Sequence, residues 1–422
     1  MSNAIPDSSA VLVAVRSARR LVATVFFVTM CIGTFRSQAA AQSITRIDGF
    51  APSETVFVSR VSANGEMVVG SSGSRGFRWT RAGGLRDLGA IPGGTYSRAY
   101  GVSADGSVIV GMCGPSAPFN WEVAFRWTEA GGMIPLGGLP AGNRSSAIGV
   151  SADGSTVVGS NGEYLRVVRS FRWTAAGGMV DLGTVPGLSV GLATGVNADG
   201  SVVVGSCGVI DWPTIAPFRW SASTGMQQLP MPEWAETGVA NVISSNGSTI
   251  VGYVYGHAVK HAVRWTGNGL DDIGAAVPER YSEAMGASGD GSVVVGEMDG
   301  EARVVAFMWT AELGMVDLNV YLPSQGVDLT GWSLELARDI SSDGRTIIGR
   351  GMQGARRNVA WVVQLPPVCF ADFDESGAVD SQDLFAFLDA FFVQDPGADF
   401  QRDGFVNSQD FFDFVGAFFA GC

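Results

Sequence analysis

The sequence has 422 residues, of which 58 are Gly, 46% are hydrophobic and only 16% are charged, and its formal net charge is −13. This composition favours a folded chain with many turns over a disordered one. Residues 369–422 hold eleven acids and one Arg, so the negative charge is concentrated at the C-terminal end. No basic stripe is present that would displace phosphate counterions, which argues against nucleic acid as a partner.

The N-terminal residues have the pattern of an export signal. Arg16, Arg19 and Arg20 precede the apolar run "LVATVFFVTMCIG", and "AAA" at 39–41 supplies small residues for cleavage. This pattern predicts a signal peptide over residues 1–41, cleaved after Ala41, and therefore a secreted protein that is extracellular or at the cell surface. The apolar run is short for a membrane span, so we expect no transmembrane segment after cleavage; an uncleaved anchor is the alternative.

Residues 42–365 form a repeat array built on three motifs. A tripeptide such as "FRW" follows a segment such as "VSADGSVIVG" and precedes one such as "GGMVDLG", and the unit recurs every 44 to 52 residues. Asp-Gly and Asn-Gly between β-branched runs are hairpin signals, so each unit predicts four short strands, the content of one propeller blade. Seven units predict a mainly β, seven-bladed propeller. The Trp residues that mark the seven units are Trp79, Trp127, Trp173, Trp220, Trp265, Trp309 and Trp361.

The two ends of the array predict how the ring closes. The last unit stops at "NVAWVVQL" without its final strand, whereas residues 43–50, "SITRIDGF", form a strand-like piece with no unit of their own. If this piece completes the last blade, the propeller has no free sheet edge. An open solenoid is the alternative, because a repeat period alone does not show closure.

The repeats resemble the HAF family of extracellular repeats, whose members carry tandem "GVSADGSVVVG", "AFRWT" and "GMxDLG" segments. The resemblance implies secretion and a surface setting, and the family brings no established reaction. Within the repeats, the Phe and Trp residues are expected to form the core between blades. Arg172 is predicted to lie across a hairpin from Asp181, and Arg78 across from Asp87, as pairs that hold blades together.

The propeller sequence contains no recognisable catalytic motif. His257 and His261 lack the third ligand that a zinc site needs, and the carboxylates Glu233, Glu279 and Glu283 cannot be paired from sequence. After signal removal four Cys remain. Cys113 and Cys207 are two blades apart, too far for a bridge. Cys369 and Cys422 bracket the C-terminal segment and are predicted to form a disulfide.

The C-terminal segment, residues 366–422, contains two copies of an acidic loop followed by a Phe-rich helix. "ADFDESGAVDSQDLFAFLDAFF" begins at Ala371, and a similar stretch begins 27 residues later. Oxygen-bearing side chains at loop positions 1, 3, 5, 9 and 12, with Gly at 6, are typical of calcium loops. We therefore predict two bound Ca²⁺ ions; a helical hairpin with merely solvated acids is the alternative. The predicted ligands are Asp372, Asp374, Ser376, Asp380 and Asp383 in the first loop, and Asp399, Gln401, Asp403, Asn407 and Asp410 in the second.

These two loop–helix halves resemble a dockerin, the small module that binds cohesin-like partners. The closing "GC" is similar to GC-type dockerins of secreted bacterial proteins. The resemblance implies a small α-helical module that attaches the protein to a cohesin-like or surface-anchoring partner. Loop positions 10 and 11 are the implied partner contacts, and they correspond to Ser381, Gln382, Ser408 and Gln409.

Together these features predict a secreted, non-enzymatic binding or scaffold propeller, attached or sorted through a calcium-dependent C-terminal module. A polysaccharide or a protein is the expected ligand of the propeller. The alternative is an extracellular carbohydrate-active enzyme, a glycosidase or lyase, that uses carboxylates on the loop face.

Overall fold

The structure is a computed structural model, and the predicted signal peptide lies outside the residues that it describes. The structure describes residues 44–422, except for residues 116–121, 141, 143, 163–167, 210–214, 275–280, 366–372, 375–378, 396–397, 399–405 and 421–422. No helix within this described part is long and apolar enough to cross a membrane.

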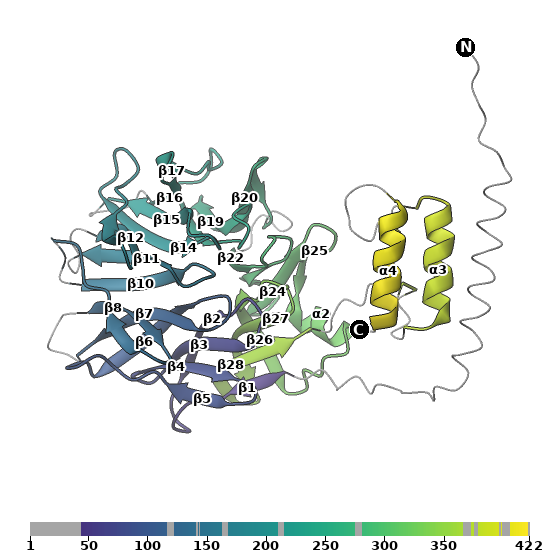
Figure 1. Cartoon of the computed structure of the whole chain (residues 1–422), viewed down its shortest axis with the longest axis horizontal. Helices are drawn as coiled ribbons and strands as arrows, with labels where there is room; N and C mark the ends of the chain where they lie inside the picture. Colours follow the sequence, from purple (N-terminus) through teal and green to yellow (C-terminus); the bar gives the residue numbers. More distant parts are fainter. Residues whose placement is uncertain are drawn as a thin grey trace, which may run out of the picture. The chain divides into compact units, whose positions relative to one another are not determined.

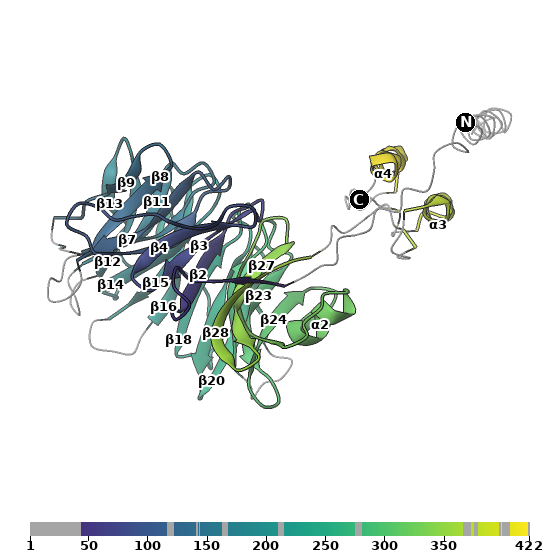
Figure 2. The same cartoon turned by 90° about the horizontal axis from the view of Figure 1, so that it is seen from below.

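The repeat array folds into seven four-stranded antiparallel sheets arranged around a common centre, which confirms the predicted seven-bladed propeller (Figures 1 and 2). The first strand of each blade is innermost, since these strands contact one another around the ring. Blade 1 contains β2 (Val56–Val61), β3 (Met67–Ser72), β4 (Arg75–Thr80) and β5 (Gly84–Asp87). Blade 2 contains β6 (Tyr96–Val102), β7 (Val108–Gly114), β8 (Val123–Thr128) and β9 (Gly132–Pro135). Blade 3 contains β10 (Arg144–Val150), β11 (Thr156–Gly162), β12 (Val168–Thr174) and β13 (Gly178–Asp181). Blade 4 contains β14 (Val190–Val196), β15 (Val202–Gly208), β16 (Ile215–Ser221) and β17 (Gly225–Gln228). Blade 5 contains β18 (Thr237–Ile243), β19 (Ile250–Gly256), β20 (Val259–Thr266) and β21 (Gly269–Asp272). Blade 6 is β22 (Ser282–Ala287), β23 (Val294–Asp299), β24 (Val304–Thr310) and β25 (Gly314–Asp317), and blade 7 contains β26 (Trp332–Ile340), β27 (Thr346–Gln353) and β28 (Arg356–Gln364).

The fourth strand of blade 7 comes from the N-terminal end of the described chain. Strand β1 (Thr45–Ile47) pairs antiparallel with β28, with Thr45 opposite Val362 and Ile47 opposite Ala360 (Figure 1). Ile47 is only 2% exposed and packs into the apolar layer between blades 7 and 1. The predicted closure of the ring through residues 43–50 is therefore confirmed.

A second closure runs through the backbone of the turns that join the first and second strands of each blade, here called the Asp-Gly turns. In blade 2, Ser103 donates to Asp105 at 2.8 Å, and the backbone N–H of Ser107 donates to the same Asp105 oxygen at 2.9 Å. Each turn also donates a backbone hydrogen bond to the next blade, which places seven such bonds in an unbroken ring. They run from Ala63 to Ala104, Ala104 to Ala152, Ala152 to Ala198, Ala198 to Ser245, Asn246 to Gly289, Gly289 to Ser342 and Ser342 back to Ala63, at 2.9–3.1 Å.

The Gly that ends the "VSADGSVIVG"-type motif is required for steric reasons. A Cβ on Gly205 would lie 2.0 Å from the carbonyl oxygen of Leu192 and 2.9 Å from the ring of Phe218. The inner strand bulges toward this Gly, and the first aromatic residue of the "FRW" motif fills the space on its other side. The two motifs therefore recur together because each Gly makes room for a carbonyl group and an aromatic ring.

This close approach predicts that Gly205→Ala destabilises the propeller by about 3 kcal/mol, because overpacking forces the backbone or Phe218 to move. Thermal or denaturant unfolding of the purified chain would measure the loss. Gly267→Ala is the matched control, since a Cβ there meets no atom within 4 Å, and it should leave stability nearly unchanged. Equal stability of the two variants would contradict the steric explanation.

The predicted pairings of Arg172 with Asp181 and of Arg78 with Asp87, across the hairpin to the "GGMVDLG"-type motif, are wrong. Asp181 lies opposite Phe171, and Arg172 lies opposite Val180; likewise Asp87 lies opposite Phe77. Arg172 instead reaches the next blade, where it donates to the carbonyl oxygen of Gly200 at 3.2 Å. Arg78 pairs with Glu129 of the next blade. Both arginines therefore link blades, but not through the predicted Asp residues, because the hairpin pairs residues one position away from the predicted register.

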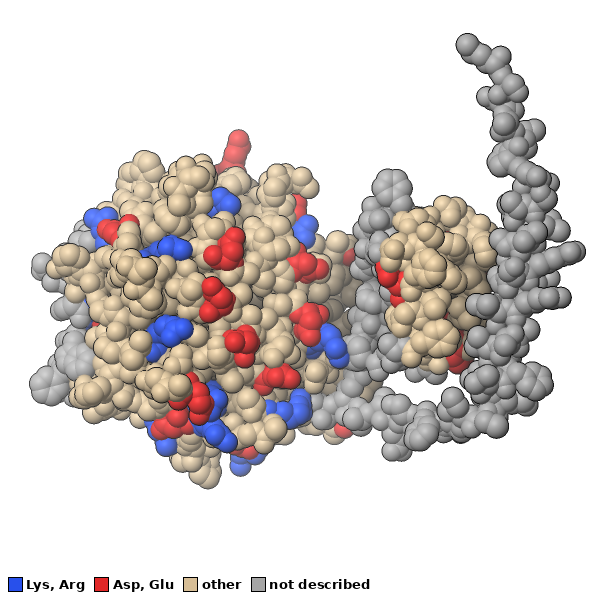
Figure 3. Space-filling model, viewed as in Figure 1, with Lys and Arg blue, Asp and Glu red and all other residues tan. Residues whose placement is uncertain are grey.

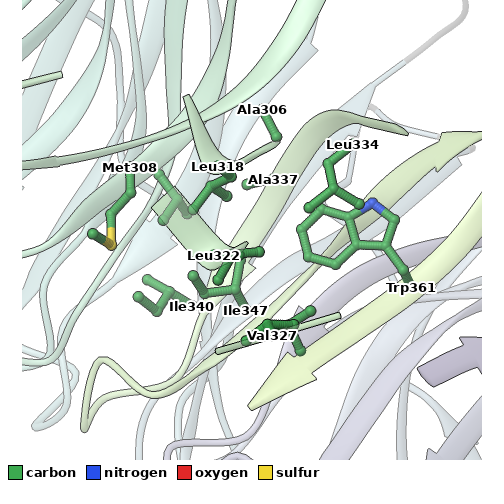
Figure 4. Close-up of a cluster of buried hydrophobic side chains, with 12 residues drawn as sticks. Ala306, Met308, Leu318, Leu322, Val327, Leu334, Ala337, Ile340, Ile347 and Trp361 are labelled. Atoms are coloured by element: carbon green, nitrogen blue, oxygen red, sulfur yellow. The ribbon is translucent and has the colours of Figure 1, made fainter. Parts of the chain in front are cut away.

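The last repeat is also offset from the predicted alignment. Trp361 lies opposite Gly349, as Phe77 lies opposite Gly70, so Trp361 occupies the place of the first aromatic residue in the motif. It is fully buried between blades 6 and 7 with Leu334 and with two residues of the short helix α2 (Leu318–Ser324), namely Leu318 and Leu322 (Figure 4). A larger ring fits here because this helix extends the apolar layer.

The C-terminal segment contains helices α3 (Ser381–Phe392) and α4 (Ser408–Ala420). Phe387 and Phe414 are equivalent in the 27-residue repeat, and their rings stack at a centroid distance of 3.9 Å with an interplanar angle of 1°. Phe373 packs its edge against both rings, at 5.4 and 6.1 Å. Symmetric pairing of equivalent Phe residues confirms that the two halves form one small helical unit.

Candidate functional site

The central channel is lined by the one repeat position at which all seven blades differ. Strand β26 has an additional bulge at Glu335, but all seven inner strands share a β-bulge at one repeat position, and the residue there has no partner in the second strand. The residue before it is Ala in six of the seven blades, whereas the bulged residue itself is never repeated. The bulged residues are Ser59, Tyr100, Ile148, Thr194, Asn241, Met285 and Arg338. Five of them line cavities at the channel: Ser59, Tyr100, Ile148, Thr194 and Arg338.

A second variable position pairs across the first two strands of each blade. In blades 1, 3 and 4 the second strand carries Ser at this position, but blades 5, 6 and 7 carry Tyr253, Glu297 and Arg350. In blade 6 the pair is Glu283 opposite Glu297, two carboxylates on the same face of the sheet. Like charges directly opposite one another are destabilising unless cations or shared protons compensate them.

Lys260 and Tyr281 provide that compensation. Together with Glu283 and Glu297 they form a group that is here called the channel cluster. Lys260 forms an ion pair of 2.9 Å with Glu283, and the Tyr281 hydroxyl lies 3.1 Å from Glu283 and 2.8 Å from Glu297. The Lys260 ammonium also lies over the rings of Tyr253 and Tyr281, at 4.0 and 4.7 Å. Asn241, a bulged residue, donates to Glu283 at 3.1 Å, which connects the cluster to the channel.

The electrostatics of the channel cluster favour retention of protons. Burial and the neighbouring Glu283 raise the pKa of Tyr281, so this phenol stays neutral. Burial also raises the pKa of Glu297, and Glu283 adds to the effect, while Tyr281, Arg350 and Lys260 offset it in part. One phenol proton cannot serve two carboxylates at once. The cluster therefore favours a proton on Glu297, while Glu283 forms the ion pair with Lys260.

Blades 7 and 1 meet at a further buried charge. Asp339 accepts a hydrogen bond of 2.9 Å from the backbone N–H of Val61 in blade 1. Burial raises the pKa of Asp339, and the nearby Arg60 opposes that rise. Asp339 and Arg60 stand where four of the other blades have Gly, so this contact belongs to the joint between the last blade and the first.

The structure separates the other residues that sequence reasoning considered for chemistry. Glu283 lies within β22, not in an inter-blade segment, Glu233 is exposed, and Glu279 is outside the described residues. His257 is exposed in a turn with φ 50°, whereas His261 is buried and bonded to Asp272 at 2.7 Å. Within the described part of the chain, no three His, Cys, Asp or Glu side chains form a group suited to a metal ion.

Half of the predicted calcium ligands are described. Asp383 is fully buried and accepts the backbone N–H groups of Asp374 at 3.1 Å and Asp380 at 2.8 Å. Burial opposes its ionisation, but these N–H donors hold the pKa of Asp383 below its ordinary value. In the second half, Asp410 is equally buried and accepts the backbone N–H of Asn407 at 2.7 Å. The other predicted ligands are outside the described residues: Asp372, Ser376, Asp399, Gln401 and Asp403.

The donor chemistry of these residues fits a hard cation. A buried carboxylate that accepts hydrogen bonds from its own loop is the arrangement a loop needs at its last ligand position, and both halves have it. Asp380 and Asn407 occupy equivalent places just before α3 and α4, and each accepts a backbone N–H of its helix, at 2.7 and 2.8 Å. The residues present therefore suit calcium, and calcium binding stays a prediction.

The predicted partner contacts are all at the surface. Ser381, Gln382, Ser408 and Gln409 are exposed in the first turns of α3 and α4. Four exposed Phe residues continue the same helices and form two equivalent pairs, Phe385 with Phe412 and Phe392 with Phe419, at 54–75% exposure. Two of the four Phe residues of α3 and two of the five of α4 are therefore exposed to solvent.

The cysteine predictions are tested only in part. Cys113 and Cys207 are buried and unbridged, as expected for residues two blades apart, and burial raises the pKa of both thiols. Cys369 and Cys422 are outside the described residues, so their disulfide remains a prediction.

No family model and no curated protein sequence matches this chain. Among solved structures, it is similar to an oligogalacturonate lyase in complex with manganese, at TM-score 0.51 and 13% identity, covering 77% of this chain and 93% of that chain. It is also similar to an oligogalacturonate lyase from Vibrio parahaemolyticus, at TM-score 0.51 and 9% identity, covering 77% and 94%. TolB from Acinetobacter baumannii matches at TM-score 0.41 and 10% identity, over 64% of each chain. At these identities the likeness concerns the fold alone, a seven-bladed β-propeller.

Proposed function

We propose that the protein is a secreted, non-enzymatic binding propeller, attached or sorted through a calcium-dependent C-terminal module. The observation that carries this proposal is the contrast between framework and channel. The Asp-Gly turns, the strand glycines and the core aromatics recur from blade to blade, while the bulged residues at the channel are all different. Such a contrast is expected where a uniform scaffold presents a specific binding surface.

The surface chemistry supports a polar ligand such as a polysaccharide or a protein. The channel cluster combines two carboxylates, a lysine and a tyrosine, and Tyr supplies rigid contact area with a polar tip. Figure 3 shows several acidic side chains over the middle of one face of the propeller, with basic side chains around them. A mixed, non-uniform charge pattern suits recognition of one ligand better than general electrostatic attraction.

The attachment role belongs to the helical unit that resembles a dockerin. Asp374, Asp380 and Asp383 would help to hold one Ca²⁺, and Asn407 and Asp410 the other. Bound calcium would neutralise part of the surplus negative charge and fix the loops. The exposed Ser-Gln pairs and the four exposed Phe residues would then form two equivalent contact surfaces for a cohesin-like or surface-anchoring partner. The HAF-like repeats and the predicted signal peptide favour the same extracellular setting.

A pull-down of secreted proteins and polysaccharides by the full mature chain, with calcium and with chelator, tests the proposal. We expect an anchoring partner that is lost with chelator, and a second ligand whose binding survives chelation because it uses the propeller. Tyr100→Ser, which copies the bulged residue of blade 1, should weaken the second ligand and spare the first. Capture that is insensitive to both chelator and Tyr100→Ser would contradict the proposal.

An extracellular carbohydrate-active enzyme is the second candidate, favoured by the Glu283–Tyr281–Glu297 arrangement. Glycosidases use a pair of carboxyl groups of which one is protonated, and burial raises the pKa of Glu297, which favours its protonated form. Product release from acidic and neutral polysaccharides, lost in both Glu283→Gln and Glu297→Gln, would establish this alternative. A wild-type chain that binds polysaccharide without releasing product excludes it for that substrate.

A further inference from the structure

A cavity of about 320 Å³ lies where blades 7 and 1 meet at the channel. Its lining includes Val56, the first residue of β2, and Asn358, near the start of β28, so it lies toward the end of the blades opposite the Asp-Gly turns. The volume is at the lower end of the range for small-molecule sites, which suits a single sugar ring.

Two arginines and no acidic residue line this cavity. Arg338 is the bulged residue of β26, and Arg350 is the variable residue of β27. The Arg350 Nε is buried and has no hydrogen-bond partner. The Arg338 guanidinium donates to Met285 Sδ at 3.7 Å, and a thioether sulfur is a weak acceptor. A buried guanidinium donor without a partner is costly, and it is the group that a bound anion would satisfy.

The acidic residues near Arg338 lie outside the cavity lining, so they do not take the place of a bound anion in it. Glu283, Glu297 and Asp339 are close enough to Arg338 to act on it electrostatically, but none of them lines the cavity. Arg60 adds a further positive charge nearby, and burial lowers the pKa of Arg338 to about 10, so Arg338 remains charged at neutral pH. The charged residues that line the cavity are therefore both cationic, and the acidic residues near them lie outside the lining.

The other residues that line the cavity indicate what the uncharged part of the ligand should be. Phe57 is 53% exposed at the cavity, Tyr100 is half-buried, and Val56, Val58 and Leu336 add apolar surface. An aromatic ring beside cationic forks suits a ligand with a C–H face and one anionic group. Asn358, exposed at the rim, can bond a hydroxyl group.

We propose that this cavity binds the carboxylate-bearing ring of an acidic sugar, a hexuronate unit, with its carboxylate between Arg338 and Arg350. This inference rests on the proposed binding function of the propeller and specifies its ligand class. The planar, forked donors of Arg match a carboxylate, and two of them confer preference over a neutral sugar.

Calorimetric titration of the full mature chain with glucuronate, glucose and acetate tests the proposal. We expect glucuronate to bind about tenfold or more tightly than glucose, which lacks the charge, and than acetate, which lacks the ring. Arg338→Met and Arg350→Met should each weaken glucuronate binding about tenfold or more. Both should fold, because Met285 and Met112 occupy the equivalent positions in blades 6 and 2, and an unchanged melting temperature checks this.

Arg356→Met is the matched control, since it removes one charge from an exposed position of β28 that does not line the cavity. Glucuronate binding that survives Arg350→Met as well as Arg356→Met overturns the inference, even if the propeller still captures a ligand in the pull-down. Equal binding of acetate and glucuronate overturns the sugar assignment. Specific glucuronate binding by a chain that captures nothing in the pull-down supports the cavity and contradicts the wider binding role.

Discussion

Deletion of residues 43–50 is expected to lower the free energy of unfolding of the propeller by about 4 kcal/mol or more. The deletion removes Ile47 from the layer between blades 7 and 1, and full loss of a buried Ile side chain costs about 2–5 kcal/mol. It also leaves β28 with an unpaired edge, which adds unsatisfied backbone groups and a template for association. Denaturant unfolding followed by tryptophan fluorescence would measure the loss, and light scattering would detect the association.

The surface contacts of the same strand provide the control. Arg46 and Asp48 form an ion pair of 2.7 Å, but the Asp48 side chain is 65% exposed. Asp48→Ala should therefore change stability by less than about 1 kcal/mol, because exposed pairs contribute little. If the deletion behaves like Asp48→Ala, β1 does not contribute to closure and the ring is held by the backbone bonds of the Asp-Gly turns alone.

Removal of calcium is expected to unfold the helical unit of residues 366–422 and to leave the propeller folded. The apolar core of this unit is small, and in the described residues only Phe387, Ala398 and Phe414 are fully buried apolar residues. Small domains of this kind need a metal or disulfide for stability, and metal binding free energy becomes folding free energy. Chelation should abolish the helical part of the far-ultraviolet circular dichroism, while the thermal transition of the propeller is unchanged.

The two loops should not contribute equally. The first has four predicted carboxylate ligands and the second has three, so the first should bind about tenfold more tightly, or roughly 1.4 kcal/mol. Asp372→Ala should then destabilise the unit more than Asp399→Ala, measured by calcium titration of the full chain. Retained helical signal in chelator for the wild-type chain would show that the acids are merely solvated. Loss of the tighter site in Asp399→Ala alone would reverse the order of the loops.

The propeller could be predicted from sequence because its determinants are local and repeated. Asp-Gly turns, β-branched strands and paired Gly–aromatic positions each specify one short-range contact, and seven copies average out local errors. Closure through residues 43–50 was predictable for the same reason, since one unit lacked a strand and one strand lacked a unit. The register of Arg172 was not, because a turn at residues 176–177 was expected, whereas the structure pairs Thr174 with Gly178 across a three-residue turn, 175–177.

The channel residues were missed because they follow no motif. Glu283, Glu297 and Lys260 come from three strands of two blades, and nothing in their spacing pairs them. A signal was nevertheless present in the sequence. The residue two positions before each "VS"-type motif differs in all seven repeats, although its neighbour is almost always Ala. Arg338 and Tyr100 stand at that position, so alignment of the repeats against one another would have identified them.

The pairing of β1 with β28 also determines the order in which the protein can finish folding. Thr45 is synthesised long before its partner Val362, which belongs to the last strand of the seventh blade. Blades 1 to 6 can form as they appear, because their strands are consecutive, whereas blade 7 must wait for both ends of the array. Long-range pairing of this kind is slow, and until it is complete β28 presents an open edge. An early fragment that ends before β28 would therefore leave β1 without its partner, so truncation near residue 356 is expected to be far more harmful than truncation after residue 365.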